Sequence, residues 1–135
     1  MENRIKKVAV LGAGTMGAQI AGHFSNAGIS ALLFDINSEL AKKGVEALTK
    51  LRPAPLYKPK NAELITACTY DTDLEKLKDV DLVIEAVAEN LDIKHTVYKN
   101  IIPHLKDSVI MSSNTSGIPL EDLIKVLPDS LKSRF

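Results

Sequence analysis

The sequence contains little that would suit a disulfide scaffold, a thiolate metal site or a nucleic-acid coat. It has one cysteine, no tryptophan, and 17 Lys and Arg residues balanced by 17 Asp and Glu residues among 135. A single cysteine cannot form an internal disulfide or a site with several thiolate ligands, so we expect Cys68 to be a small core residue. A general nucleic-acid-binding protein needs clustered excess Lys and Arg. We therefore expect no nucleic-acid partner and no bound metal.

Long apolar runs are also missing. No stretch approaches the ~18 uncharged apolar residues of a membrane helix, and the apolar run 8–11 after the basic N-terminus is broken by glycines before it could form a signal peptide. We expect a cytoplasmic protein without a membrane span. With 45% hydrophobic and 25% charged residues the chain can fill a core, and its length suits one domain over residues 1–135.

Short apolar runs alternate with helical patterns along the chain. Strands are expected over 5–11, 29–34, 64–70, 81–87 and 108–111, with a sixth starting near 133–135. Helices are expected over 15–27, 39–51, 72–78, 91–105 and 119–127, and three prolines predict an irregular strap over 52–60. The strands are apolar on both faces, which predicts an α/β fold: a doubly wound parallel (Rossmann) sheet of at least five strands with helices on both faces.

A glycine motif follows the first expected strand. The residues Gly12-Ala-Gly14-Thr-Met-Gly17 form the pattern G-x-G-x-x-G between a strand and a helix. In this setting Gly12 allows the tight turn, Gly14 lets a diphosphate approach the backbone, and Gly17 lets the helix pack closely on the strand. The helix N-terminus adds N–H groups and a positive dipole. The pattern predicts a dinucleotide site, and the alternative is a glycine-rich turn without a ligand.

Asp35 ends the second expected strand, 18 residues after Gly17. A carboxylate there can accept hydrogen bonds from both hydroxyls of the adenosine ribose. It would repel the 2′-phosphate of NADP, and no Arg follows closely to compensate. Asp35 therefore favours NAD as the cofactor, and the alternative is that it only caps the next helix.

Three blocks give the chain a more specific resemblance. They are VAVLGAGTMGAQIA at 8–21, DLVIEAVAENLDIK at 81–94 and SSNTSGIPLEDL at 112–123. The sequence resembles the N-terminal NAD-binding domain of the 3-hydroxyacyl-CoA dehydrogenases of fatty-acid β-oxidation, and the proline strap resembles that of the large bacterial members with further domains. The resemblance implies an oxidoreductase that converts (3S)-3-hydroxyacyl-CoA to 3-ketoacyl-CoA with NAD.

The resemblance also implies roles for individual residues. Met16 would contact the cofactor, while 87–89 and Lys94 would lie on its nicotinamide side. Ser116 would take part in catalysis by placing the substrate hydroxyl, although Asn114 and Thr115 could be plain turn residues. Glu85, inside an apolar strand, must be paired or point to the rim, and we assign it no catalytic role. The residues expected to bind NAD are Gly12, Ala13, Gly14, Thr15, Met16, Gly17, Asp35, Ile36, Ala86, Val87, Ala88, Glu89, Lys94, Asn114 and Ser116.

Two features depart from the family pattern. The family's catalytic base is a His in a His-Phe-Phe-Asn-Pro motif shortly after an Arg-Phe segment, and none of His23, His95 and His104 matches that position. We therefore expect an N-terminal part of a longer enzyme that is inactive alone, and the resemblance implies that the full-length enzyme is a homo-oligomer. The region 36–61 is also shorter than the family's helical arm, so CoA contacts by Lys42, Lys43 or Lys50 are not expected.

Two other functions stay open at this point. One is a β-hydroxyacid dehydrogenase of the hydroxyisobutyrate type, whose domain also begins with a glycine block; the residues 112–116 argue against it. The other is a non-catalytic dinucleotide-binding module, which would explain the lack of a matching His.

Overall fold

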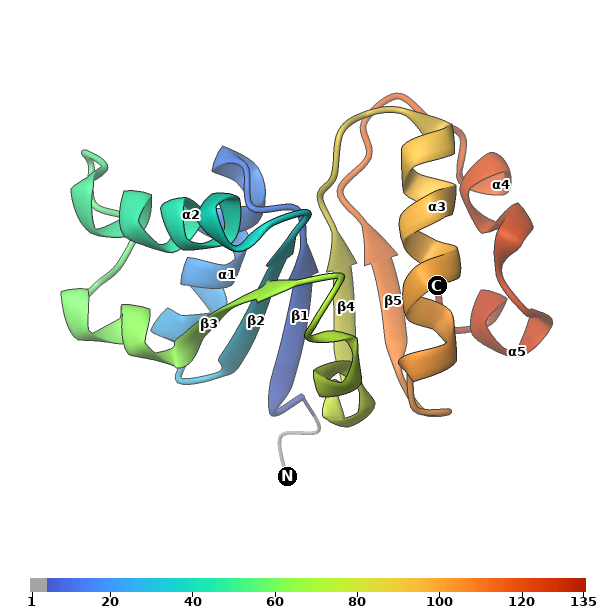
Figure 1. Cartoon of the computed structure of the whole chain (residues 1–135), viewed down its shortest axis with the longest axis horizontal. Helices are drawn as coiled ribbons and strands as arrows, with labels where there is room; N and C mark the ends of the chain where they lie inside the picture. Colours follow the sequence, from blue (N-terminus) through green and yellow to red (C-terminus); the bar gives the residue numbers. More distant parts are fainter. Residues whose placement is uncertain (1–4) are drawn as a thin grey trace.

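The protein is built on one parallel sheet of five strands. The computed structural model describes residues 5–135, in which the strands are β1 (Lys7–Leu11), β2 (Ser30–Asp35), β3 (Ile65–Thr69), β4 (Leu82–Glu85) and β5 (Ile110–Ser113). Their order across the sheet is β3-β2-β1-β4-β5, and every neighbouring pair is parallel (Figure 1). The doubly wound fold expected from the sequence is confirmed.

Helices cover both faces of this sheet. The α-helices are α1 (Thr15–Asn26), α2 (Ser38–Lys50), α3 (Leu91–Ile101), α4 (Leu120–Leu123) and α5 (Asp129–Lys132). Short 3₁₀ helices are η1 (Pro59–Leu64), η2 (Leu74–Asp79), η3 (Ile102–His104) and η4 (Ile124–Val126). Between residues 5 and 135, no helix combines the length and the apolar character needed to cross a membrane.

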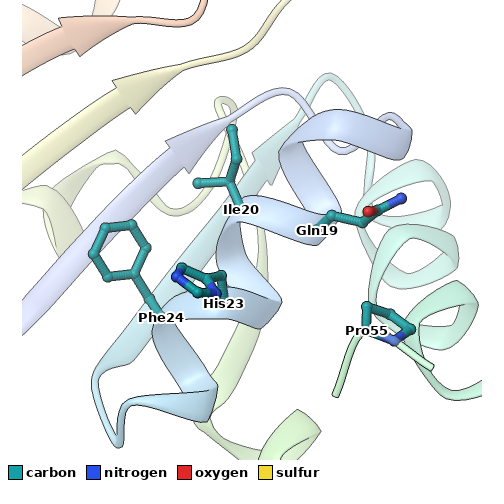
Figure 2. A pocket seen from close by; sticks show the side chains of 5 residues that line it. All are labelled: Gln19, Ile20, His23, Phe24 and Pro55. Carbon is teal, nitrogen blue, oxygen red and sulfur yellow. The ribbon is translucent and has the colours of Figure 1, made fainter. Parts of the chain in front are cut away.

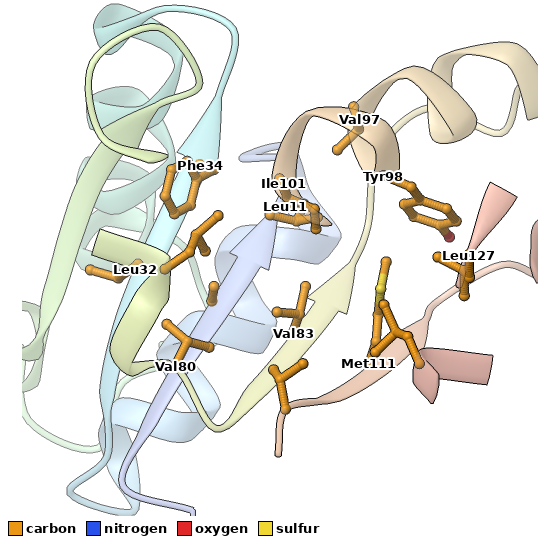
Figure 3. Packing of buried hydrophobic residues seen from close by; sticks show 14 of the residues in the cluster. Leu11, Leu32, Phe34, Val80, Val83, Val97, Tyr98, Ile101, Met111 and Leu127 are labelled. Carbon is orange, nitrogen blue, oxygen red and sulfur yellow. The ribbon is translucent and has the colours of Figure 1, made fainter. Parts of the chain in front are cut away.

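The alternation of side chains along β1 explains why the sheet has two cores. Val8 and Val10 pack on one face with residues of α1 and α2, whereas Ala9 and Leu11 pack on the other face with residues of α3. All four side chains are fully buried. Figure 3 shows the α3 side, where the ring of Tyr98 lies among the buried residues of this core.

Several helices differ from the expected ones in extent or type, and proline explains the first of these differences. The helix expected over 91–105 ends at Ile101, because Pro103 lacks the N–H that would continue the α-helical pattern, and the chain continues as η3. The helix expected over 119–127 is broken into α4 and η4, and α5 begins after Pro128. The segment expected as a helix over 72–78 is the 3₁₀ helix η2, and the strap ends in η1.

The end of the described chain lies beside β5. The backbone N–H of Met111 donates a 2.9 Å hydrogen bond to the carbonyl of Arg134, and the Arg134 side chain donates to the carbonyl of Val109 at 2.7 Å. Residues 133–135 form no strand, so the expected sixth strand does not begin within the described residues. The hydrogen bond from Met111 to Arg134 is of the kind that joins neighbouring strands.

Candidate functional site

A cavity of about 520 Å³ opens at the carboxyl ends of the strands. The strand order reverses between β1 and β4, and ligands of doubly wound sheets bind in the crevice at such a switch point. Most of the residues predicted to bind NAD lie in its wall. These are Gly12, Gly14, Thr15, Met16, Gly17, Asp35, Ile36, Ala86, Val87 and Ala88.

The glycine loop brings the backbones of three segments together. Gly12 has a φ of +104°, and a Cβ on it would lie 2.5 Å from the carbonyl oxygen of Ala86 in the segment after β4. A Cβ on Gly17 would lie 1.8 Å from the carbonyl oxygen of Gly12, so α1 can start this close to β1 only with glycine there. Both positions therefore need glycine for the fold itself.

Gly14 differs from the other two glycines because it faces open space. A Cβ built on Gly14 would meet no atom within 4 Å. Gly14 is also the N-cap of α1, where no side chain among the described residues caps the helix and its first turn carries no acidic residue. The open backbone and the uncapped helix N-terminus suit the binding of an anionic diphosphate.

Asp35 holds the glycine loop and reaches the cavity. Its carboxylate accepts the N–H of Ala13 at 2.8 Å and the N–H of Ile36 at 2.7 Å, one on each oxygen. Each carboxylate oxygen has a second lone pair, which leaves capacity for the hydroxyls of a ribose. The cap of α2 is Asn37, which accepts the N–H of Leu40 at 2.9 Å, so the reading of Asp35 as a mere helix cap is wrong.

A buried ion pair lies beneath the β4 end of the site. The Lys94 ammonium is 2.5 Å from a carboxylate oxygen of Glu85, and these residues are 1% and 0% exposed. Glu85 also accepts hydrogen bonds from the hydroxyls of Tyr98 and Ser113 and from the N–H of Val87. Of the two alternatives left open for Glu85, the structure shows pairing. Lys94 is buried against its partners and does not line the cavity.

Glu89 joins the two loops that follow β4 and β5. One oxygen accepts the N–H groups of Ser116 and Gly117 at 2.9 and 3.1 Å, and the other accepts the hydroxyl of Thr115 at 2.8 Å. The Lys94 ammonium lies 3.3 Å from that second oxygen. These donors, led by the Ser116 N–H, lower the pKa of Glu89 to about 2. The exposed carboxylate is thus ionised across the physiological range and fixes the Ser116 loop.

Some predicted residues lie beside the cavity rather than in its wall. Ala13 contributes its N–H to Asp35, and Asn114 donates its backbone N–H to the Glu85 carbonyl at 2.8 Å while its side chain is exposed. Ser116 is exposed, with its hydroxyl 3.4 Å from Glu89. Direct contact with a cofactor stays a prediction for Ala13, Asn114, Ser116, Glu89 and Lys94, as it does for the ten residues in the wall.

Three residues in the wall were missed in the sequence. Tyr70 follows β3, and Ile93 and Val97 lie one turn apart on α3. A signal existed for Tyr70, because it is the first residue beyond the carboxyl end of a strand, where ligands bind in this fold. Ile93 was less visible, since an apolar residue at helical spacing is usually a core residue.

None of the three histidines lines this cavity. His23 is exposed on α1 and faces a separate hollow of about 380 Å³ between α1 and Pro55 (Figure 2). A ring nitrogen of His95 is 2.7 Å from the carbonyl oxygen of Asp122. His104 is half-buried in η3 and borders a surface hollow with Glu75 and Lys78.

Comparison with known proteins points to one family. Residues 7–133 match the family model described as the 3-hydroxyacyl-CoA dehydrogenase, NAD binding domain. A Deinococcus radiodurans protein that carries the name 3-hydroxyacyl-CoA dehydrogenase is 45% identical over 98% of this chain and 40% of its own length. A Rickettsia felis protein named for a trifunctional enzyme of a fatty acid oxidation complex is 44% identical over the whole chain and 20% of its own length.

Solved structures agree with the sequence matches. The structure of (S)-3-hydroxybutyryl-CoA dehydrogenase from Ralstonia eutropha superposes with a TM-score of 0.76 at 33% identity, over 93% of this chain and 46% of that one. The chain spans less than half the length of each of these three proteins. Their names support a 3-hydroxyacyl-CoA dehydrogenase domain and give no support to the hydroxyisobutyrate type.

Proposed function

Because the chain belongs to the family of NAD-binding domains of the 3-hydroxyacyl-CoA dehydrogenases, we propose that it is the cofactor-binding part of an enzyme that oxidises (3S)-3-hydroxyacyl-CoA to 3-ketoacyl-CoA. One observation carries this proposal. The glycine loop, the Asp35 carboxylate and the Ser116 loop held by Glu89 all lie at the same carboxyl edge of the sheet.

Each part of this edge has a distinct binding task. The backbone from Gly12 to Gly17 holds the diphosphate, and Asp35 accepts the hydroxyls of the adenosine ribose. Val87 and Ala88 then form the wall on the nicotinamide side. When bound, the nicotinamide ring supplies the hydride-accepting chemistry. Because Asp35 is followed by Ile36 and Asn37 rather than by Arg, the site favours NAD over NADP.

Ser116 is the residue proposed to place the substrate hydroxyl. Its N–H is fixed by Glu89, and Glu89 is in turn held by Thr115 and Lys94. A hydroxyl on a loop held in this way loses little conformational freedom when a ligand binds. The 3-hydroxyacyl group would therefore meet the cofactor at the rim formed by the loops after β4 and β5.

Oxidation of an alcohol also needs a group that accepts its proton. His23, His95 and His104 all lie away from the cavity wall. We therefore propose that the 135-residue chain binds the cofactor without turning over substrate by itself. This same observation favours the second candidate, a dinucleotide-binding module without its own catalysis.

An activity assay separates these possibilities. Acetoacetyl-CoA reduction, followed as NADH loss, should be undetectable with the 135-residue chain. A chimera that carries this chain in place of the matching segment of the Deinococcus protein should both bind NADH and consume it. A chimera that binds NADH but shows no turnover would contradict the enzyme proposal. If the chain alone is active and this activity disappears in His23→Ala, His95→Ala or His104→Ala, that histidine would be the catalytic base.

A further inference from the structure

Tyr70 combines a position in the cavity wall with a hydroxyl that has nothing to bind. It follows Thr69, which pairs with Asp35 across β2 and β3, so both side chains stand at the same edge of the sheet. The Tyr70 ring stacks on Phe34, with centroids 5.6 Å apart and an interplanar angle of 23°. This stacking holds the ring against a buried residue of the core.

The Tyr70 hydroxyl is the one buried side-chain polar atom without a hydrogen-bond partner in the described chain. The carboxylates of Asp35 and Glu85 are close enough to raise the pKa of Tyr70, but neither forms a hydrogen bond with its hydroxyl. Leaving a buried hydroxyl unpaired costs free energy, and phenylalanine would fill the same space without that cost. A hydroxyl kept under these conditions points to a partner that arrives with a ligand.

The position of Tyr70 along the cavity identifies which part of the ligand it would meet. The diphosphate belongs at the glycine loop after β1, and the adenosine ribose belongs at Asp35 after β2. The base attached to that ribose therefore lies toward β3. There the wall includes Tyr70 and the exposed apolar side chain of Ile36, and the exposed side chain of Ile93 lines the same cavity from α3. An apolar slot with a single polar group suits a flat heteroaromatic base.

We propose that Tyr70 binds the adenine ring of the dinucleotide and that its hydroxyl forms a hydrogen bond with the base. This inference rests on the proposed function as an NAD-binding domain. A phenol can donate to a ring nitrogen of adenine or accept from its exocyclic amine. Burial, aided by the negative charges of Asp35 and Glu85, raises the pKa of Tyr70, so the hydroxyl keeps its proton at physiological pH. Its oxygen is shielded from water. The proposal therefore requires that neighbouring side chains move aside when the base binds.

Calorimetric titration of Tyr70→Phe tests this assignment. The variant keeps the stacked ring and removes only the hydroxyl. We expect NAD⁺, ADP-ribose and AMP to bind roughly tenfold more weakly to it than to the wild type, the scale of one lost hydrogen bond. Binding of nicotinamide mononucleotide, which lacks adenine, should not change. Tyr57→Phe is the matched control, because Tyr57 is 77% exposed and should leave all four affinities unchanged.

The outcomes are distinguishable from a failure of the proposed function. If the wild-type chain binds none of the adenine ligands, the proposed function itself is wrong. If the wild type binds NAD⁺ and Tyr70→Phe binds it equally well, the role of Tyr70 is overturned. A second measurement needs no variant: in wild-type protein labelled with ¹³C at the tyrosine ring, AMP should shift the Tyr70 resonance and leave that of Tyr57 in place. A Tyr70 resonance that does not move under saturating AMP would contradict the proposal.

Discussion

Gly17 stands so close to Gly12 that a Cβ on Gly17 would lie 1.8 Å from the Gly12 carbonyl oxygen. Gly14, between them, has open space where its Cβ would be. The three glycines of one motif therefore serve two different purposes. Gly12 and Gly17 let β1, α1 and the segment after β4 pack together, whereas Gly14 leaves room for a ligand.

This division predicts opposite results for two alanine variants. Gly17→Ala should lower the free energy of unfolding by about 1–3 kcal/mol, the usual cost of overpacking, because the Gly12 backbone cannot move away freely. Gly14→Ala should keep the stability within about 1 kcal/mol and still weaken NAD⁺ binding, since its methyl group enters the ligand space. Urea denaturation and calorimetry measure the two effects. Equal stabilities of the two variants would contradict the geometry.

Asp35→Ala should weaken NAD⁺ binding by ~1–3 kcal/mol, the scale for hydrogen bonds to a charged group. Part of that loss arises in the loop, because Asp35 also holds the N–H of Ala13. Discrimination against NADP⁺ should fall at the same time, since the repulsive carboxylate is gone. Titration of the variant with both cofactors measures these changes. If the variant binds NAD⁺ as tightly as the wild type, Asp35 does not contribute to cofactor binding.

Glu89 should titrate far below an ordinary glutamate. Its pKa falls from 4.5 to about 2 because the Ser116 N–H, the Thr115 hydroxyl and the Gly117 N–H favour the ionised form. A depressed pKa means that the stabilisation is present above pH 4.5 and is lost as the pH falls toward 2. NMR titration of the assigned Glu89 carboxyl carbon should give a midpoint near 2. In Glu89→Gln that resonance should disappear, together with the loss of stability that its protonation causes. A midpoint near 4.5 for Glu89 in the wild type would contradict the hydrogen bonds by which it joins the loops after β4 and β5.

Cys68 should be chemically inert in the folded protein. Its side chain lies in the core, and burial, with a contribution from Asp73, raises the pKa of the thiol to about 11. The thiolate is the reactive form, so a thiol reagent at pH 8 should label Cys68 only after urea unfolds the chain. Rapid labelling of the native protein would show that β3 opens readily at this point.

The sequence predicted the sheet, the glycine loop and Asp35 because these depend on local patterns. Alternating elements imply parallel strands, and the carboxyl ends of such strands form one binding edge. The pairing of Glu85 with Lys94 could not be derived, since it depends on how α3 packs on β4. For Tyr70 the sequence signalled a position at the carboxyl end of a strand, but its proximity to Asp35 depends on the register of β3 against β2. The change from α4 to the 3₁₀ helix η4 after Leu123 depends on tertiary packing, which helix propensities do not predict.

The most direct test of the central claim is calorimetric titration of the 135-residue chain with NAD⁺ and with NADP⁺ under identical conditions. The glycine loop and the uncapped start of α1 predict that NAD⁺ binds with a stoichiometry of one. Asp35, with no Arg beside it, predicts that NADP⁺ binds at least about tenfold more weakly, since one unfavourable charge contact of ~1.4 kcal/mol already gives that ratio. Equal or tighter binding of NADP⁺, or no binding of either cofactor, would contradict the account of this site.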